Sequence, residues 1–181
     1  MSFYEERILP HLINCACGMK AINKQREKVV PLARGEVLEI GMGSGLNLQY
    51  YDAAQVDKVH GLEPSLGMEK KASKNLQSSP VEVDWLTAGC EDIPLDDDSI
   101  DTVMLTYALC TIPDWQTALL EIRRVLKSNG QLVFCEHGES PDESVRRWQQ
   151  RINPIWKKLA GGCNLNRPIP TMISDSGFKI A

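Results

Sequence analysis

The stretch EVLEIGMGSG, residues 36–45, places three alternating glycines directly after a short apolar run. The apolar run 36–40 predicts a strand and residues 46–52 predict a helical turn, so the glycines stand at a strand-to-helix junction. Glycine there permits positive φ angles and lets a ligand approach the backbone, while amides at a helix N-terminus face an anionic or polar group. For this loop alone, a tight turn without a ligand is the competing interpretation.

An acidic residue strengthens the interpretation as a binding loop. Glu63 ends a second predicted strand, 57–63, and stands 22 positions after Gly41. A carboxylate at about this spacing can accept hydrogen bonds from ribose hydroxyls. Glu63 alone would also fit a solvated strand end, but together with the glycine loop it favours a nucleoside site. The dinucleotide fingerprint G-x-G-x-x-G is not matched, because Leu46 stands where its third glycine would be.

The rest of the chain alternates between strand and helix patterns. Apolar or alternating runs predict strands at 36–40, 57–63, 81–87, 101–107 and 131–136. Helical periodicity predicts helices over 3–28, 65–77, 114–127 and 142–160. Asp114 is the expected N-cap of the third helix, and Asn153-Pro154 is expected to break the fourth. This alternation predicts an α/β fold, a doubly wound and mostly parallel sheet with helices on both faces and ligands beyond its carboxyl ends.

Length and composition limit the function classes. The chain has 181 residues, of which 43% are hydrophobic and 24% charged, as expected for one globular domain and not for a disordered chain. Its formal net charge of −4 argues against a general nucleic-acid binder. We therefore expect no nucleic acid among its partners.

The cysteines and the N-terminus indicate a cytoplasmic protein with reduced thiols. The six cysteines include Cys15-x-Cys17 but no C-x-x-C pair, so no metal site is expected. The first residues, MSFYEERILPHLIN, lack a basic start and an uninterrupted apolar run, which argues against a signal peptide. No stretch reaches the ~18–20 apolar residues of a membrane span.

Four motifs in order along the chain carry a family resemblance. The first is Glu39-x-Gly41-x-Gly43-x-Gly45, and the others are Leu62-Glu63-Pro64-Ser65 with Met68, the segment 90–101, and the helix–turn 121–130. Together they resemble the class I S-adenosylmethionine-dependent methyltransferases of the type 11 domain, over about residues 30–137. The resemblance implies a Rossmann-like fold, S-adenosylmethionine as cofactor, S-adenosylhomocysteine as product, and no metal requirement.

The resemblance also implies which residues hold the cofactor. They are Glu39, Gly41, Met42, Gly43, Ser44, Gly45, Glu63, Pro64, Ser65, Met68, Cys90, Glu91, Thr106 and Tyr107. The sequence departs from the family at Gly89, where an aspartate is frequent. Adenine contact is then expected to depend on the Cys90 backbone and on Glu91.

The tail is similar to a methyltransferase subfamily whose animal members are membrane-associated and methylate small alkyl thiols. The similarity lies in Glu136-His137, Trp148-Gln149-Gln150, Asn153-Pro154, Trp156 and residues 162–167. Two further strands would follow Ser176-Gly177-Phe178 in that family, whereas this chain ends at Ala181. We therefore expect missing C-terminal strands and an exposed sheet edge that permits self-association. Within a single domain, 1–181, residues 1–29 would form a helical lid, 30–137 the cofactor core and 138–181 the acceptor-side cap.

The acceptor side is predicted from residues that follow the strands. His137 is the candidate general base, with a purely structural histidine as the alternative, and His11 and His60 are weaker candidates. Cys110 is expected to pack and not to act as a nucleophile. The expected acceptor residues are Tyr107, Trp148, Trp156, Asn164 and Arg167.

These features predict methyl transfer to a small lipophilic thiol, phenol or amine. The alternatives are a non-catalytic nucleoside-binding module and an NAD-dependent oxidoreductase. The apolar face of helix 142–160 permits peripheral contact with a membrane, although packing on the sheet or over the site is the preferred expectation.

Overall fold

The structure contains one five-stranded parallel sheet with the strand order β3-β2-β1-β4-β5. It is a computed structural model that describes residues 17–181. The strands are β1 (Gly35–Ile40), β2 (Val56–Leu62), β3 (Glu82–Leu86), β4 (Ile100–Thr106) and β5 (Leu126–Cys135). The strand order reverses direction at β1, so the carboxyl ends of β1 and β4 flank the position where ligands bind in such sheets.

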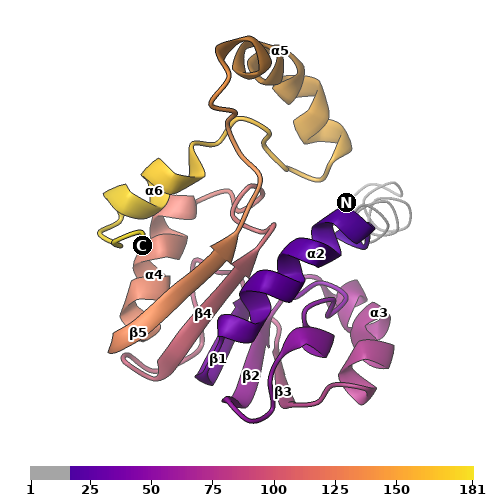
Figure 1. Ribbon diagram of the computed structural model, residues 1–181, viewed down its shortest axis with the longest axis vertical. Helices are drawn as coiled ribbons and strands as arrows, with labels where there is room; N and C mark the ends of the chain where they lie inside the picture. Colours follow the sequence, from indigo (N-terminus) through magenta and orange to yellow (C-terminus); the bar gives the residue numbers. More distant parts are fainter. Residues whose placement is uncertain (1–16) are drawn as a thin grey trace.

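Helices cover both faces of the sheet, as predicted (Figure 1). The helices of the described residues are α2 (Lys20–Val29), α3 (Leu66–Gln77), α4 (Trp115–Val125), α5 (Glu143–Leu159) and α6 (Ile169–Asp175), with short 3₁₀ helices at Val30–Leu32 and Leu48–Tyr50, and all of the α-helices except α5 pack on the sheet. The expected helix over 3–28 therefore lies mostly outside the described residues. Within the described part of the chain, no helix is both long and apolar enough to cross a membrane.

Alternating side chains of the central strands build two separate cores. Leu38 and Ile40 of β1 face α4 and α6, where Leu119 and Ile173 are almost fully buried. Val37 of the same strand faces the opposite core, which is closed by the segment after α2 and by α3. Because β1 is buried on both faces, its sequence is an apolar run and does not alternate between apolar and polar residues.

Helix α4 begins where the sequence predicted and ends earlier. The Asp114 carboxylate accepts a hydrogen bond from the backbone N–H of Thr117 at 3.2 Å, which confirms the N-cap. The helix ends at Val125 instead of residue 127, because Leu126 pairs with Ile100 in the sheet. Residues 127–130 then bulge out before Gln131 pairs with Thr102. The Asn129-Gly130 turn therefore lies inside the span of β5 instead of preceding it.

The expectations for helix α5 were wrong in two respects. The helix continues through Pro154 without a break. Proline has no backbone N–H, so this 17-residue helix lacks one backbone hydrogen bond and is held by the others. Its apolar face is not packed on the sheet, since Trp148 and Ile155 are 63% and 67% exposed. Figure 1 shows α5 standing apart from the sheet, beyond the carboxyl end of β5.

Candidate functional site

A cavity of about 420 Å³ opens at the carboxyl ends of β1, β2 and β4. The glycine loop after β1 forms one wall, and the segments after β2, β3 and β4 form the others. Of the predicted cofactor residues, all except Gly45 line this cavity. Further lining residues come from α2 and its preceding segment, the end of the glycine loop, the loop before α4, and the turn after α5: they include Cys17, Arg26, Asn47, Thr111, Ile112 and Gly161.

The three glycines of the loop all adopt left-handed backbone conformations. Their φ angles are +65° at Gly41, +58° at Gly43 and +72° at Gly45. A Cβ on Gly41 would lie 2.9 Å from the Cβ of Ala108, whereas a Cβ on Gly43 would meet its first neighbour, the Met68 methyl, at 3.5 Å. The loop therefore needs glycine for its conformation throughout, and at Gly43 it leaves room for a ligand against the backbone.

Glu63, the first residue after β2, connects the two sides of the cavity. Its carboxylate accepts hydrogen bonds from the backbone N–H groups of Gly43 and Ser65, both at 3.0 Å. Burial raises the pKa of this carboxyl, and the two backbone hydrogen bonds oppose that shift. A carboxylate has about four acceptor positions, so Glu63 retains capacity for ribose hydroxyls.

A buried polar network lies beneath the loop and was not predicted. Asn47 donates to the Glu39 carboxylate at 3.1 Å and to the Thr106 hydroxyl at 2.9 Å, and it accepts from Arg26 Nε at 2.9 Å. Tyr51 donates to the second Glu39 oxygen at 2.8 Å. Burial raises the pKa of Glu39 to about 7. The network fixes the end of β1 relative to β4. The only sign of this network in the sequence is the polar residue Asn47 directly after the glycine loop.

Tyr107, the residue after β4, has a strained backbone. Its φ is +56°, which a bulky residue adopts only where the surroundings impose it. The Arg26 guanidinium lies 5.2 Å from the ring centroid, and the backbone N–H of Tyr107 donates to the Cys135 carbonyl at 3.0 Å. These contacts hold the start of the β4–α4 loop at the cavity wall.

Glu136, directly after β5, caps the same loop. One carboxylate oxygen accepts from the N–H groups of Ala108 at 2.6 Å and Leu109 at 3.0 Å. The other oxygen is buried without a hydrogen-bond partner among the described residues. Burial raises the pKa of this carboxyl to about 7.

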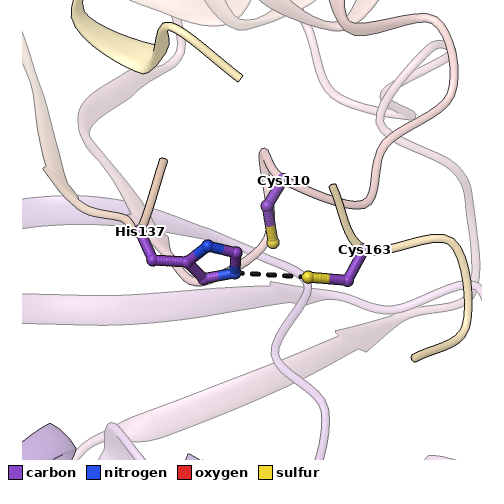
Figure 2. Close-up of side chains that lie close together, drawn as sticks. All are labelled: Cys110, His137 and Cys163. Atoms are coloured by element: carbon purple, nitrogen blue, oxygen red, sulfur yellow. Dashed lines mark hydrogen bonds between the residues drawn. The ribbon is translucent and has the colours of Figure 1, made fainter. Parts of the chain in front are cut away.

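His137 lies next to two cysteines (Figure 2), and it is not among the residues that line the cavity. Its Nε2 is 3.3 Å from Cys163 Sγ, and the sulfur of Cys110 lies close by, with all three atoms within 4.8 Å of one another. The hydrogen bond with Cys163 raises the pKa of His137, while burial opposes it. The sequence did not indicate this cluster, because its members come from three distant segments. The role of His137 as a base stays a prediction.

The other predicted acceptor residues, apart from Tyr107, do not line the cavity. Asn164 donates from its side chain to the carbonyls of Cys110 and Gly162, both at 2.9 Å. Arg167 donates to the carbonyls of Leu109 and Ile112. Both side chains thus tie the segment after α5 to the β4–α4 loop.

The two predicted tryptophans lie farther out, on α5. Trp156 is 42% exposed and donates from Nε1 to Cys163 Sγ at 3.4 Å, whereas Trp148 is mainly solvent-exposed. The acceptor role predicted for both residues, and for Asn164 and Arg167, stays a prediction.

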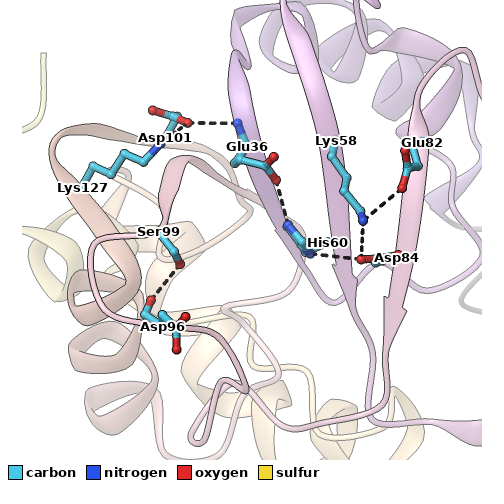
Figure 3. Close-up of polar contacts among 9 residues, drawn as sticks. All are labelled: Glu36, Lys58, His60, Glu82, Asp84, Asp96, Ser99, Asp101 and Lys127. Atoms are coloured by element: carbon cyan, nitrogen blue, oxygen red, sulfur yellow. Dashed lines mark hydrogen bonds and ion pairs between the residues drawn. The ribbon is translucent and has the colours of Figure 1, made fainter.

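His60 belongs to a polar ladder across the sheet (Figure 3). Its Nε2 lies 2.9 Å from a Glu36 oxygen, and its Nδ1 lies 3.8 Å from an oxygen of Asp84. Lys58 pairs with the same aspartate at 2.6 Å. These contacts join β1, β2 and β3 away from the cavity, so His60 has a structural role. His11 lies outside the described residues.

The fold and the cavity define an α/β protein with a candidate ligand site at the switch point of its parallel sheet, and comparison with known proteins identifies its family. Residues 38–134 match the methyltransferase domain family. The chain is 36% identical to the human thiol S-methyltransferase TMT1B over 141 residues, 75% of this chain and 57% of that protein. It is 32% identical to a demethylmenaquinone methyltransferase of Clavibacter sepedonicus over 135 residues, 72% of this chain and 54% of that protein. The chain belongs to the methyltransferase domain family and is similar to its class I S-adenosylmethionine-dependent members.

Solved structures agree on the fold. A SAM-dependent methyltransferase of Thermotoga maritima superimposes with a TM-score of 0.67 at 22% identity, covering 97% of this chain and 81% of that one. A SAM-dependent methyltransferase from Aquifex aeolicus superimposes with a TM-score of 0.62 at 18% identity, covering 83% of this chain and 87% of that one. The chain spans about half the length of the curated relatives it matches.

Proposed function

We propose that this protein transfers the methyl group of S-adenosylmethionine to a small, lipophilic thiol. The observation that carries the proposal is the cavity itself, where a glycine loop with open backbone at Gly43 faces the Glu63 carboxylate. Family membership supports the reaction class, and the names of several relatives support the acceptor class.

The residues of the cavity fit the cofactor. Its volume of about 420 Å³ lies in the range typical of small-molecule sites, and polar groups are few and localised. The glycine loop and Glu63 would hold the ribose, Cys90 and Glu91 the adenine side, and Thr106 and Tyr107 the methionine side. The partly free acceptor capacity of Glu63 suits vicinal hydroxyls.

The bound cofactor supplies an already activated sulfonium methyl group. The protein therefore has to orient the acceptor in line with that methyl and keep water out. Tyr107 and the β4–α4 loop are positioned to shape this side of the cavity, since Arg26, Glu136 and Arg167 all fix their backbone or ring. A thiol acceptor must also lose its proton, and His137 is the base we propose for it.

Relatives favour a thiol over the other acceptors that the sequence left open. Thiol S-methyltransferases of human and rat are 36% and 34% identical to this chain. The demethylmenaquinone methyltransferase relative keeps a quinone-type ring as the second candidate acceptor. Because the chain spans about half the length of each relative, both acceptor classes belong in the same assay.

The test is methyl transfer from labelled S-adenosylmethionine to a matched panel. The panel contains alkyl thiols, the corresponding alcohols, a phenol, a menaquinol-type ring and an amine. We expect labelled thioether from the thiols, none from the alcohols, and none with the Glu63→Ala variant. Labelling of the ring alone would replace the thiol assignment. Tight binding of S-adenosylhomocysteine without transfer to any acceptor would instead support a non-catalytic nucleoside-binding module, and NAD serves as the binding control.

A further inference from the structure

Two cysteines and a histidine converge beside the cavity, and the sulfurs have no part in the proposed transfer. Cys110 comes from the loop after β4, His137 from the segment after β5, and Cys163 from the turn after α5 (Figure 2). We propose that Cys110, His137 and Cys163 bind a zinc ion, with the fourth coordination position left for water or an external ligand. Three protein ligands with an open position is a known arrangement for zinc.

The donor atoms are already near coordination distances. Tetrahedral zinc has bonds of ~2.3 Å to sulfur and ~2.0–2.1 Å to nitrogen, which puts two sulfur ligands ~3.8 Å apart and sulfur and nitrogen ~3.6 Å apart. Here His137 Nε2 lies 3.3 Å from Cys163 Sγ, and no pair among the three donor atoms exceeds 4.8 Å. Side-chain shifts of about 1 Å or less would therefore complete the site.

The backbone holds the two cysteine segments at a fixed separation. Asn164, the neighbour of Cys163, donates from both its backbone N–H and its side-chain amide to the Cys110 carbonyl, each at 2.9 Å. The same side chain bonds the Gly162 carbonyl at 2.9 Å. The loops thus do not have to be brought together by the metal, which lowers the entropy cost of binding.

Neighbouring donors suit metal-bound thiolates. Trp156 Nε1 donates to Cys163 Sγ at 3.4 Å, and the Thr111 hydroxyl lies 3.5 Å from Cys110 Sγ. Hydrogen bonds of this kind orient ligands and stabilise their charge. On binding, each thiol exchanges its S–H bond for an S–Zn bond and releases its proton to the solvent, so one zinc ion displaces two protons.

The proposal is tested with the full chain, reduced and stripped of metal. Zinc is titrated in competition with a chromophoric chelator, and cobalt(II) is used as a spectroscopic probe. We expect one equivalent of each metal, thiolate-to-cobalt charge-transfer bands, and visible bands typical of tetrahedral cobalt. Cys163→Ser and His137→Ala should weaken zinc binding by more than ~100-fold, and Trp156→Phe by ~10-fold. Cys135→Ser, which changes a cysteine outside the cluster, should bind like the parent.

Folding of the variants is checked by circular dichroism. The half-buried Cys163 carries the test, because Cys110 is almost fully buried and its replacement can disturb packing. Absence of cobalt binding by the reduced parent would overturn the proposal, and so would unchanged affinity in Cys163→Ser. A Cys110–Cys163 disulfide that forms in the presence of zinc would also overturn it. None of these measurements needs methyl transfer, so they are independent of the proposed function. Because a zinc-bound Nε2 cannot accept a proton, the base role proposed for His137 belongs to the metal-free protein.

Discussion

The carboxylate of Glu63 accepts a hydrogen bond from the backbone N–H of Gly43 at 3.0 Å, so the residue after β2 holds the loop after β1. This contact joins the two sequence features that indicate a nucleoside site. Glu63 thus shapes the loop and, in the function proposed above, also binds the ribose of the cofactor. Variants must separate these two contributions.

We expect Glu63→Gln to weaken S-adenosylhomocysteine binding by about tenfold or more. The amide oxygen of Gln can still accept from Gly43, but the charge that strengthens bonds to ribose hydroxyls is lost, at ~1.5–3 kcal/mol per charged bond before water compensates. Glu63→Ala should lose more, because the loop also loses its partner. Calorimetry measures both, with Glu36→Gln on the polar ladder as control. Equal affinity in all three variants would remove Glu63 from the site.

Gly41→Ala and Gly43→Ala should differ although both glycines have positive φ. An added methyl at Gly41 meets the Cβ of Ala108 at 2.9 Å, so this variant combines backbone strain with a clash and should lower the melting temperature more. At Gly43 the strain costs about 1 kcal/mol, and the methyl occupies ligand space. Gly43→Ala should therefore fold like the parent but bind S-adenosylhomocysteine poorly. Scanning calorimetry and ligand titration on both variants check this; equal thermal losses with normal binding would contradict it.

His137→Ala and Cys163→Ser distinguish a base from a metal ligand. If His137 takes the acceptor proton, His137→Ala lowers turnover by ~10²–10⁴-fold at normal cofactor affinity, and Cys163→Ser has a much smaller effect in metal-free protein. We expect this difference in single-turnover assays with the thiol acceptor. Equal turnover of His137→Ala and the parent, with chemistry rate-limiting, would show that His137 is not the base.

The contribution of Glu39 to stability should fall as pH rises from about 4.5 toward 7, because burial raises the pKa of Glu39 to about 7. In this range the folded protein keeps a proton on Glu39 that the unfolded chain has released, and proton binding by the folded state favours folding at low pH. Burial also raises the pKa of Glu136 to about 7, so Glu136 contributes to the loss of stability over the same pH range. Glu39→Gln should remove up to about 3 kcal/mol of this decline. Urea unfolding of the parent and of Glu39→Gln at pH 5 and 7.5 measures this difference. An equal change in the free energy of unfolding between the two pH values in both proteins would contradict the assignment.

Local patterns in the sequence determined the sheet, the glycine loop and the position of Glu63. A strand followed by three alternating glycines restricts the backbone without help from distant residues, since only glycine adopts φ near +60° at Gly41, Gly43 and Gly45 without strain. Parallel strands then bring the ends of β1, β2 and β4 together, so the cavity and nearly all of its predicted lining follow from the order of elements.

Only the tertiary structure decided which side chains meet across long sequence separations. The Glu39–Asn47–Arg26 network and the cluster of Cys110, His137 and Cys163 depend on loop paths that no local periodicity encodes. The course of α5 through Pro154, with its apolar side chains exposed, also depends on the global packing. A sequence pattern shows that a face is apolar, but whether that face finds a partner is settled by the space that the other elements leave.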